Sequence, residues 1–390
     1  MILESDFPPN VRLEKELRTL VNTGHKIILL CSSPESQNEI ITWNEATIIK
    51  NKMPRFIYKS SVGCLEYPFY FNYWRKLLKS VFDKHKFDVI HLYDLPLVKI
   101  VKEFSVKHKI PLVLDLPENR PEIMKHYHHI RTFPGNMIVS LKRWHKYQEK
   151  YTKVVDKLIL ITDEAKNDYL IKYNLDPQKI AVISNFVDIE DLNSIKFDCN
   201  ILNNYCDKFV VSYFGDTGLR RGTATIIQAA NLLERYKDIH FLIIGKSKED
   251  GILKKMIKDL NLSNVKLLGW IPFNKAVSYI KLSKIGLCPF LRNIHHDTTY
   301  ANKMFQYMFY GKPIIASDCT SQKIFVENEK CGSVFEAGNA GELAKKIIDM
   351  KLNPKYNELS KNAAKVIINK YNWQNASKVL IDMYNEISEQ

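Results

Sequence analysis

The most informative stretch for the fold lies at residues 209–222 and reads FVVSYFGDTGLRRG. It begins as a strand-sized apolar run, continues through a loop containing Gly215, Gly218 and Gly222, and leads into a helical pattern at 226–233. A buried strand, a glycine-containing loop and a helix form the unit from which helix-covered parallel sheets are built. The stretch therefore predicts an α/β fold.

The same alternation extends from this stretch toward both ends of the chain. Apolar runs separated by segments of helical period predict further strands at 26–31, 87–92, 110–114, 157–162, 180–185, 240–245, 265–269, 285–289 and 313–317. Periodicity is lost between the two sets, and an amphipathic helix closes the chain. We expect an N-terminal Rossmann-like domain at 1–187, a linker at 188–207, a C-terminal domain at 208–371 and a final helix at 372–390.

Composition excludes several classes of protein. The 390 residues are 45% hydrophobic and 26% charged, which is an ordinary globular balance, so disorder and coiled coil are excluded as the main architecture. No apolar run approaches the ~18 to 20 residues of a spanning helix. The first residues include Glu4, Asp6, Pro8 and Pro9, unlike a signal peptide. We therefore expect a cytoplasmic protein, with a peripheral position on the inner face of the cell membrane as an open alternative.

The seven cysteines are scattered without a CxxC pair. This favours reduced thiols and argues against a disulfide framework or structural zinc. The charge is less ordinary, because 57 Lys and Arg against 43 Asp and Glu leave a net +14. The excess is spread over both halves of the chain, which disfavours a single nucleic-acid-binding arm.

Two motifs are suited to binding an anion. In the loop at 215–222 the glycines allow a ligand close to the backbone, and Arg221 can bind phosphate oxygens through two N–H groups. The second motif is a predicted helix that carries Asn302, Lys303 and Gln306 on its polar face and ends before Gly311-Lys312-Pro313. Its N-terminus is a favourable seat for an anion. A structural turn and a plain amphipathic helix are the alternatives.

These motifs and their order along the chain resemble the retaining nucleotide-sugar glycosyltransferases of glycosyltransferase family 4. The resemblance covers nearly the whole chain and is carried by the stretches at 7–16, 87–94, 110–113, 183–188, 221–222, 269–272 and, most specifically, 302–313. It implies the GT-B fold, in which two Rossmann-like domains face each other across a cleft and the C-terminal helix crosses back to the N-terminal domain. It also implies a role in cell-surface polysaccharide or glycolipid biosynthesis.

The resemblance assigns residues to the donor, a nucleoside-diphosphate sugar. Arg221 and Lys303 would bind its diphosphate and stabilise the charge of the leaving group, and Gln306 would bind the ribose. No metal and no cofactor would be needed. The other donor-side positions are Gly215, Gly222, Gly245, Trp270, Ile271, Thr298 and Asn302.

The sequence departs from the family pattern at three positions. Thr298 replaces a glutamate, Asp216 replaces a phosphate-binding arginine, and Pro117 replaces an N-domain histidine. The last change leaves Glu118, Asn119 or His126 as candidate sugar contacts.

Two carboxylates follow strands of the first half. Asp94 and Glu118 lie where open α/β sheets place their ligands, so with Asn119 they are the acceptor-side candidates. A helix cap is the alternative for Asp94, and a loop carboxylate is the alternative for Glu118.

A basic, aromatic helix is expected around 70–86. Its apolar face could lie on an anionic membrane, or it could pack on the sheet with its lysines in solvent. A second cluster, rich in histidine and basic residues, spans 125–150; its histidines lack the partners of a metal site.

The sequence thus predicts a hexosyltransferase that acts on a glycan or lipid-linked acceptor and does not bind nucleic acid. Two alternatives remain open. One is a nucleotide-sugar 2-epimerase of the GT-B fold, and the other is a non-catalytic nucleotide-sugar-binding homologue.

Overall fold

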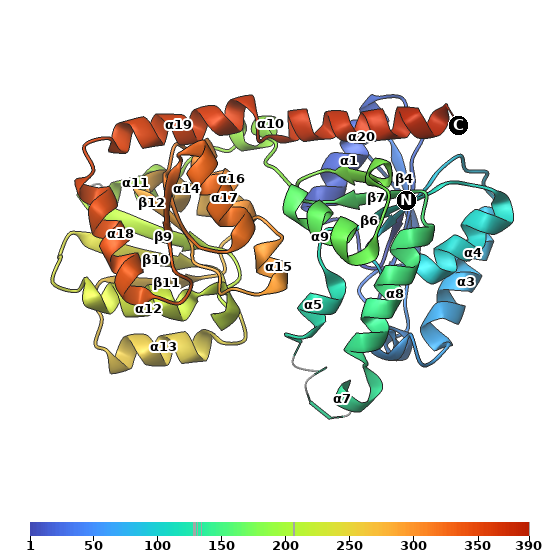
Figure 1. Cartoon of the computed structure of the whole chain (residues 1–390), viewed down its shortest axis with the longest axis horizontal. Coiled ribbons are helices and arrows are strands. Elements are labelled where there is room, and N and C mark those ends of the chain that lie inside the picture. Colours follow the sequence, from blue (N-terminus) through green and yellow to red (C-terminus); the bar gives the residue numbers. More distant parts are fainter. Residues whose placement is uncertain (128–129, 131, 134, 206, 390) are drawn as a thin grey trace. The chain divides into compact units, whose positions relative to one another are not determined.

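The computed structural model describes residues 1–389 except 128, 129, 131, 134 and 206. The chain divides into two compact units (Figure 1). Unit 1 comprises Met1–Asn185 with Ala376–Gln390, and unit 2 comprises Phe186–Asn375. Three positions of the predicted basic cluster, His128, His129 and Arg131, lie outside the described residues.

Unit 1 contains an eight-stranded sheet of order β3-β4-β2-β1-β5-β6-β7-β8. Its strands are β1 (Ile2–Leu3), β2 (Ile28–Ser33), β3 (Glu39–Trp43), β4 (Ala46–Lys52), β5 (Ile90–Tyr93), β6 (Leu112–Asp115), β7 (Lys157–Leu160) and β8 (Ile180–Val182). All neighbouring strands pair in parallel except β3 and β4. These two form a hairpin that the sequence reading missed, with Asn44 and Glu45 at positive φ in its two-residue turn.

Helices cover both faces of this sheet. They are α1 (Val11–Asn22), α2 (Arg55–Ser60), η1 (Ser61–Gly63), α3 (Phe69–Phe82), α4 (Val98–His108), α5 (Arg120–Met124), α7 (Gly135–Ile138), α8 (Leu141–Val154), α9 (Asp163–Tyr173), η2 (Pro177–Lys179) and most of α20 (Trp373–Ser388). Leu29 packs in the core beneath α1, whereas Leu30 packs in the core with α3, α4 and α8. Adjacent strand residues therefore serve opposite faces.

The final helix, α20, packs on unit 1. The Tyr384 hydroxyl lies 2.8 Å from His91 Nδ1, and Lys157 Nζ donates to Glu386 at 2.6 Å. The expectation that the C-terminal helix returns to the N-terminal domain is confirmed.

Helix α3 buries the aromatic face that could have lain on a membrane. Tyr70, Phe71, Trp74, Leu78 and Val81 all belong to the core of unit 1. The alternative expectation, packing against the sheet, therefore describes this helix.

Unit 2 contains an all-parallel six-stranded sheet of order β11-β10-β9-β12-β13-β14. Its strands are β9 (Phe209–Phe214), β10 (Ile239–Ile244), β11 (Val265–Gly269), β12 (Ile285–Cys288), β13 (Ile314–Ser317) and β14 (Gly332–Phe335). The sequence reading missed β14.

The helices of unit 2 are α10 (Ile189–Asn193), α11 (Cys199–Asn203), η3 (Leu219–Arg221), α12 (Thr223–Leu232), α13 (Asp250–Asp259), α14 (Phe273–Leu282), α15 (Ile294–Asp297), α16 (Asn302–Phe309), α17 (Thr320–Glu329), α18 (Ala340–Leu352) and α19 (Tyr356–Asn369). The stretch at 188–207, indicated as a linker by the sequence, carries α10 and α11. Its Leu192 is buried in a core cluster of this unit.

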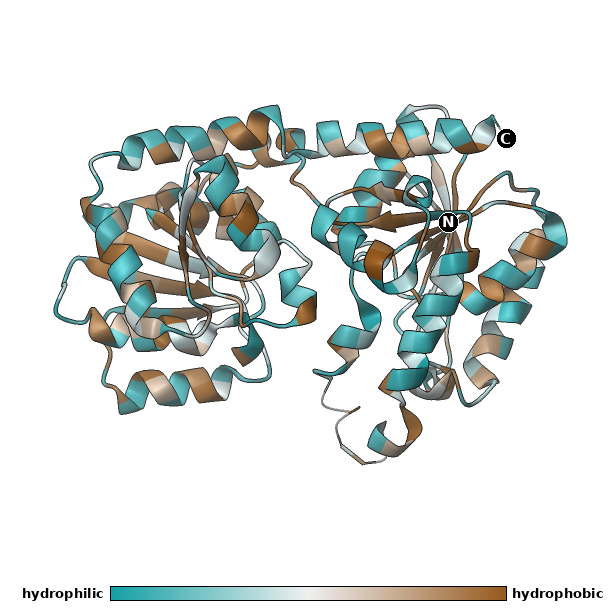
Figure 2. Cartoon of the chain, viewed as in Figure 1, coloured by the Kyte–Doolittle hydropathy of each residue, from teal (hydrophilic) through white to brown (hydrophobic). Residues whose placement is uncertain are grey.

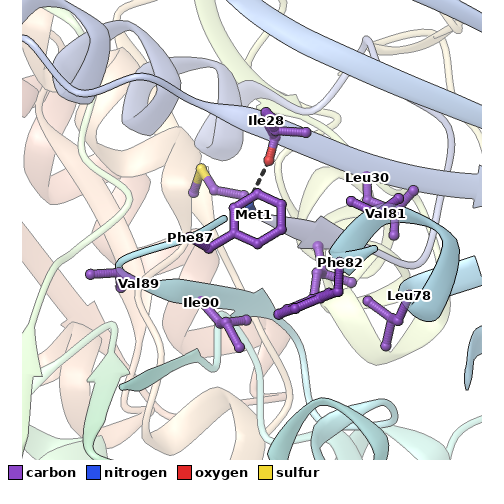
Figure 3. A pocket seen from close by; sticks show the side chains of 10 residues that line it. Met1, Ile28, Leu30, Leu78, Val81, Phe82, Phe87, Val89 and Ile90 are labelled. Carbon is purple, nitrogen blue, oxygen red and sulfur yellow. Dashed lines mark hydrogen bonds between the residues drawn. The ribbon is translucent and has the colours of Figure 1, made fainter. Parts of the chain in front are cut away.

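An apolar pocket lies where β1, β2 and β5 begin (Figure 3). Its lining includes Met1, Leu30, Leu78, Phe82 and Ile90, and the Met1 amino group donates to the Ile28 carbonyl at 2.6 Å. Burial lowers the pKa of that amine to about 5. Ligands of open parallel sheets bind at the opposite, carboxyl ends of strands, so we interpret this pocket as an imperfection of packing.

Along the part of the chain that the structure describes, no helix is both long enough and apolar enough to pass through a bilayer.

Candidate functional site

Glycines bring three strand ends of unit 2 close together. Gly215 follows strand β9, Gly245 follows strand β10 and Gly222 follows the short helix η3. All three have positive φ. A Cβ on Gly222 would lie 1.7 Å from the Pro289 carbonyl oxygen, and one on Gly245 would lie 1.8 Å from that of Gly215. No side chain fits at either position, so these glycines set the shape of the sheet edge.

Lys303 lies at this edge, and no carboxylate of the residues that the structure describes forms an ion pair with it. It stands in the first turn of α16, is only 8% exposed, and holds its Nζ 3.5 Å from the centroid of the Tyr213 ring. A Cβ on Gly215 would lie 3.1 Å from the same Nζ, which places the ammonium beside the loop after β9. Burial, reinforced by Arg221, lowers the pKa of Lys303 to about 7. Aromatic rings do not neutralise a buried ammonium, and a bound anion would supply its counter-ion.

Arg221 approaches the same place from the end of η3. Its guanidinium carbon lies 4.7 Å from the centroid of the Phe290 ring, and Lys303 Nζ lies 5.5 Å from that ring. Burial lowers the pKa of Arg221, and within the described parts of the chain its carboxylate contact is a long one, 3.5 Å from Nε to Asp216 Oδ2. The two predicted diphosphate-binding cations therefore meet around Phe290.

His296 fixes the other side of Arg221. Its Nδ1 lies 2.7 Å from the Leu291 carbonyl oxygen and 2.9 Å from Asn293 Nδ2, and we assign the hydrogen to Nδ1 because Arg221, on the other ring nitrogen, can only donate. Its Nε2 is then the acceptor for Arg221 Nη1 at 3.3 Å. This buried histidine was not predicted, because nothing in the spacing of His295 and His296 connects them to a loop more than seventy residues earlier.

The polar face of α16 is arranged as the sequence predicted. Asn302 is exposed and Gln306 half-buried, on the same short helix as Lys303. The N-cap residue, Ala301, makes no side-chain hydrogen bond to the first turn, so the amides there are not capped by a side chain. Thr298 lies one helix earlier, where its Oγ1 donates to the Ile294 carbonyl at 2.8 Å.

The remaining donor-side candidates follow β11. The Gly245 amide donates to the Gly269 carbonyl at 2.8 Å, which joins the two strand ends. Trp270 is 64% exposed, with Lys246 Nζ 5.9 Å from the centroid of its ring, and Ile271 is half-buried. A large exposed ring at a strand end is unusual and is available for stacking on a planar base.

The acceptor-side candidates lie at the carboxyl edge of the unit 1 sheet. Asp94 follows β5 with a positive φ, accepts from the Leu95 amide at 2.7 Å and pairs with Arg120 at 2.5 Å. Glu118 is exposed, and its charge acts on Arg120. Asn119 is buried and precedes α5, yet its Oδ1 has no hydrogen-bond partner.

Glu4 belongs to the same edge but was not predicted. It follows the two-residue strand β1, and the Tyr70 hydroxyl donates to its Oε1 at 2.5 Å. Burial raises the pKa of Glu4 to about 7, and the charge of Arg120 opposes that rise. Hydrophobic periodicity could not indicate Glu4, because a strand of two residues is too short to show a period.

A second cluster of acidic side chains in unit 1 is paired with an arginine. Glu16, His91 and Asp115 have ligand atoms close enough to hold a metal ion. However, Arg12 Nε lies 3.0 Å from Glu16 Oε1 and 2.9 Å from Asp115 Oδ2, and Arg12 Nη2 donates to Asp115 Oδ1 at 3.0 Å. Burial lowers the pKa of His91 to about 3, which keeps it neutral. We interpret the group as an ion-pair network that fixes α1 against β6.

Comparison with known proteins agrees with this geometry. The model of the family described as Glycosyltransferase Family 4 matches residues 10–191, and that of Glycosyl transferases group 1 matches residues 195–366. A UDP-Gal:alpha-D-GlcNAc-diphosphoundecaprenol alpha-1,3-galactosyltransferase of Escherichia coli is 24% identical over 79% of this chain and 77% of its own length.

Solved structures share the fold over almost the whole chain. Sucrose-phosphate synthase from Thermosynechococcus elongatus superposes with a TM-score of 0.77 at 15% identity, covering 99% of this chain and 95% of its own. Anabaena HepE in complex with UDP and glucose gives a TM-score of 0.71 at 16% identity, with coverages of 99% and 98%. The predicted GT-B fold is confirmed.

Proposed function

We propose, from the premise that the chain belongs to glycosyltransferase family 4 and is a GT-B glycosyltransferase, that it moves a sugar from a nucleoside-diphosphate sugar to a lipid-linked or glycan acceptor with retention. The observation that carries the donor assignment is the convergence of Lys303 and Arg221 around Phe290. Among the described residues, Lys303 has no carboxylate partner and Arg221 has the 3.5 Å contact with Asp216, and burial lowers the pKa of both. A diphosphate supplies the missing negative charge.

The reaction follows from where the charge goes. The acceptor hydroxyl oxygen attacks the anomeric carbon on the face from which the diphosphate departs. As the bond between that carbon and the phosphate oxygen breaks, the electron pair leaves with the diphosphate, which also takes the hydroxyl proton. Lys303, Arg221 and the first turn of α16 stabilise the growing charge, so these groups need no metal ion to do so.

The donor residues have distinct roles. Gln306, on the same face of α16 as Lys303, would bind the ribose, and Asn302 would contact the donor near the first turn. Trp270 and the backbone at Gly245 and Ile271 would hold the base, while Gly215 and Gly222 leave space for the diphosphate. Thr298 stands where a carboxylate would face the sugar; its hydroxyl already donates to backbone.

Unit 1 would hold the acceptor. Asp94, Glu118 and Asn119 gather at the carboxyl edge of its sheet, where ligands of such sheets bind. The Escherichia coli relative is named for a diphosphoundecaprenol acceptor and an α product. The first supports a lipid-linked acceptor here, and the second supports retention from an α-linked donor.

A binding screen followed by a transfer assay tests the proposal. Nucleoside diphosphates and their sugars are screened by thermal shift, where a ligand at about 100 times its Kd adds about 2.7 kcal/mol of stability. The stabilising donor is then incubated with extracted membrane lipids. Formation of a glycosylated lipid supports the proposal. Conversion of the donor without lipid would indicate a 2-epimerase, and stabilisation without any conversion would indicate a binding protein.

A further inference from the structure

Unit 1 exposes large apolar side chains in one region away from its core. Phe56 on α2 is 66% exposed, Phe69 at the start of α3 is 47% exposed, and Met137 on α7 is 78% exposed. Tyr58 and Tyr67 are about half exposed. In Figure 2 part of α7 is coloured as hydrophobic. Soluble proteins seldom gather this many large apolar groups in solvent unless something covers them.

These side chains form a continuous surface. The Phe56 and Phe69 rings lie 5.8 Å apart, and the Tyr67 and Phe69 rings 6.4 Å apart. Gly63, in η1, joins this group to α7, because a Cβ there would meet Ile138 at 2.8 Å and Tyr67 at 3.2 Å. We call the exposed residues of α2, α7 and the start of α3 the aromatic patch.

The sequence segments that carry the patch are rich in basic residues. The segments 52–69 and 132–146 contain six basic residues and one acidic residue, Glu66, which pairs with Arg143. The unpaired basic side chains there are exposed: Lys52, Arg55, Lys59, Lys142 and Lys146. Aromatic rings flanked by lysine and arginine suit the headgroup region of an anionic bilayer, where rings bury their apolar part and each cation gains from the surface potential.

The patch also adjoins the acceptor-side residues. Phe69 is followed directly by Tyr70, whose hydroxyl donates to Glu4 at 2.5 Å. Cys64, just after η1, is close enough for the charges of Glu4 and Arg120 to act on it. A surface that touched the membrane here would place the carboxyl edge of the unit 1 sheet near the headgroups.

We propose that the aromatic patch docks unit 1 on an anionic phospholipid surface, and that a lipid-linked acceptor reaches the edge near Glu4 and Asp94 from that surface. The docking replaces the predicted contact through the aromatic face of α3, which is buried. The identity of the acceptor rests on the proposed function, whereas binding to a bilayer does not.

Vesicle binding tests the docking. The full chain is sedimented with vesicles of phosphatidylglycerol and phosphatidylcholine, and with phosphatidylcholine alone. We expect binding to the anionic vesicles that weakens with salt, as screening requires. Phe56→Ser, Phe69→Ser and Met137→Ser together should weaken it by about tenfold or more, because each removes an apolar group that the bilayer would bury.

Matched variants test whether vesicle binding depends on the aromatic patch or on exposed apolar side chains in general. Ile40→Ser, Val106→Ser and Ile171→Ser together remove equally exposed apolar side chains elsewhere in unit 1 and should leave binding unchanged. Arg55→Glu with Lys59→Glu should weaken binding, whereas Lys76→Glu with Lys84→Glu, on and just after α3, should weaken it less. Donor-induced thermal shift is measured on every variant to show that each is folded and that unit 2 still binds.

Several outcomes would overturn the docking. The wild-type chain would fail to bind anionic vesicles, or the patch and control triple variants would lose vesicle binding equally. The third such outcome is self-association through the patch without lipid binding. Vesicle binding without any donor shift would leave the docking standing and remove the proposed function.

Discussion

The sheet edge of unit 2 and the sheet edge of unit 1 handle charge in opposite ways. In unit 2, the buried Lys303 and the half-buried Arg221 are cations that lie against aromatic rings, with one carboxylate 3.5 Å from Arg221. In unit 1, Glu4 and Asp94 are carboxylates that act on one arginine, Arg120. An edge with excess positive charge is suited to a diphosphate, and an edge with excess carboxylate is suited to hydroxyl groups. This difference supports donor binding by unit 2 and acceptor binding by unit 1.

Replacing Lys303 tests the donor edge with the largest expected effect. Lys303→Met keeps the length of the side chain but removes its charge, so transfer should fall roughly 10²- to 10³-fold, the scale seen when an electrostatic stabiliser of a transition state is lost. The apo variant should be more stable by about 1 to 3 kcal/mol at pH 7, because a buried ammonium is costly. Activity and the free energy of unfolding therefore move in opposite directions.

Lys312 provides the matched control. Burial, with Lys281 and Lys284 nearby, lowers its pKa to about 8, but it lies beyond the C-terminal end of α16, whereas Lys303 lies in the first turn. Lys312→Met should raise stability without changing donor binding. Equal loss of donor binding in both variants would show that a buried lysine charge in this region affects donor binding indirectly. It would contradict a direct contact between Lys303 and the diphosphate.

Donor binding should also depend on pH because of Lys303. Its pKa is about 7 in the free protein, and a bound diphosphate raises it toward the ordinary 10.5. Binding above pH 7 therefore takes up a proton, and the donor Kd should rise by up to about tenfold per pH unit until the bound-state pKa is reached. Calorimetry in buffers of different ionisation enthalpy measures the uptake, and Lys303→Met should abolish it. No proton uptake at pH 8 in the wild type would contradict the assignment.

The strand-loop-helix stretch at 209–222 and the helix at 302–309 show why much of the donor site could be predicted. Local signals mark them: glycines at a strand end, and a short helix stopped by Gly311 and Pro313. Tyr213, Phe290 and His296 surround the cations only through the tertiary fold, so their roles could not be read. Glu4 was missed for the related reason that β1 has two residues and owes its place to β2 and β5.

Replacing Glu4 tests the acceptor edge. With a pKa of about 7, Glu4 is mostly protonated at pH 6 and mostly ionised at pH 8. Glu4→Gln resembles the protonated form, so acceptor kcat/KM should fall by about tenfold at pH 8 and by less at pH 6. Because the pKa is raised from 4.5, wild-type stability should fall as pH rises from about 4.5 to 7, and the variant should lack this slope.

Tyr70→Phe is the control for Glu4. The Tyr70 hydrogen bond lowers the pKa of Glu4, so its removal should shift the acceptor pH profile upward while leaving donor binding unchanged. A shift in the donor profile instead would show that the two edges do not act separately.

Asp216 offers the test with the smallest expected effect, because among the described residues it is the carboxylate that contacts Arg221 beside Lys303. It lies 3.2 Å from Arg220 and 3.5 Å from Arg221, and is itself partly exposed. An exposed pair of this kind contributes little, so Asp216→Asn should tighten nucleoside-diphosphate binding by only about two- to fivefold. Asp216→Lys, which places a cation where the family has one, should tighten it further and steepen the salt dependence. Weaker binding in both variants would mean that Asp216 positions Arg221 for the diphosphate, and that the donor edge depends on its carboxylate after all.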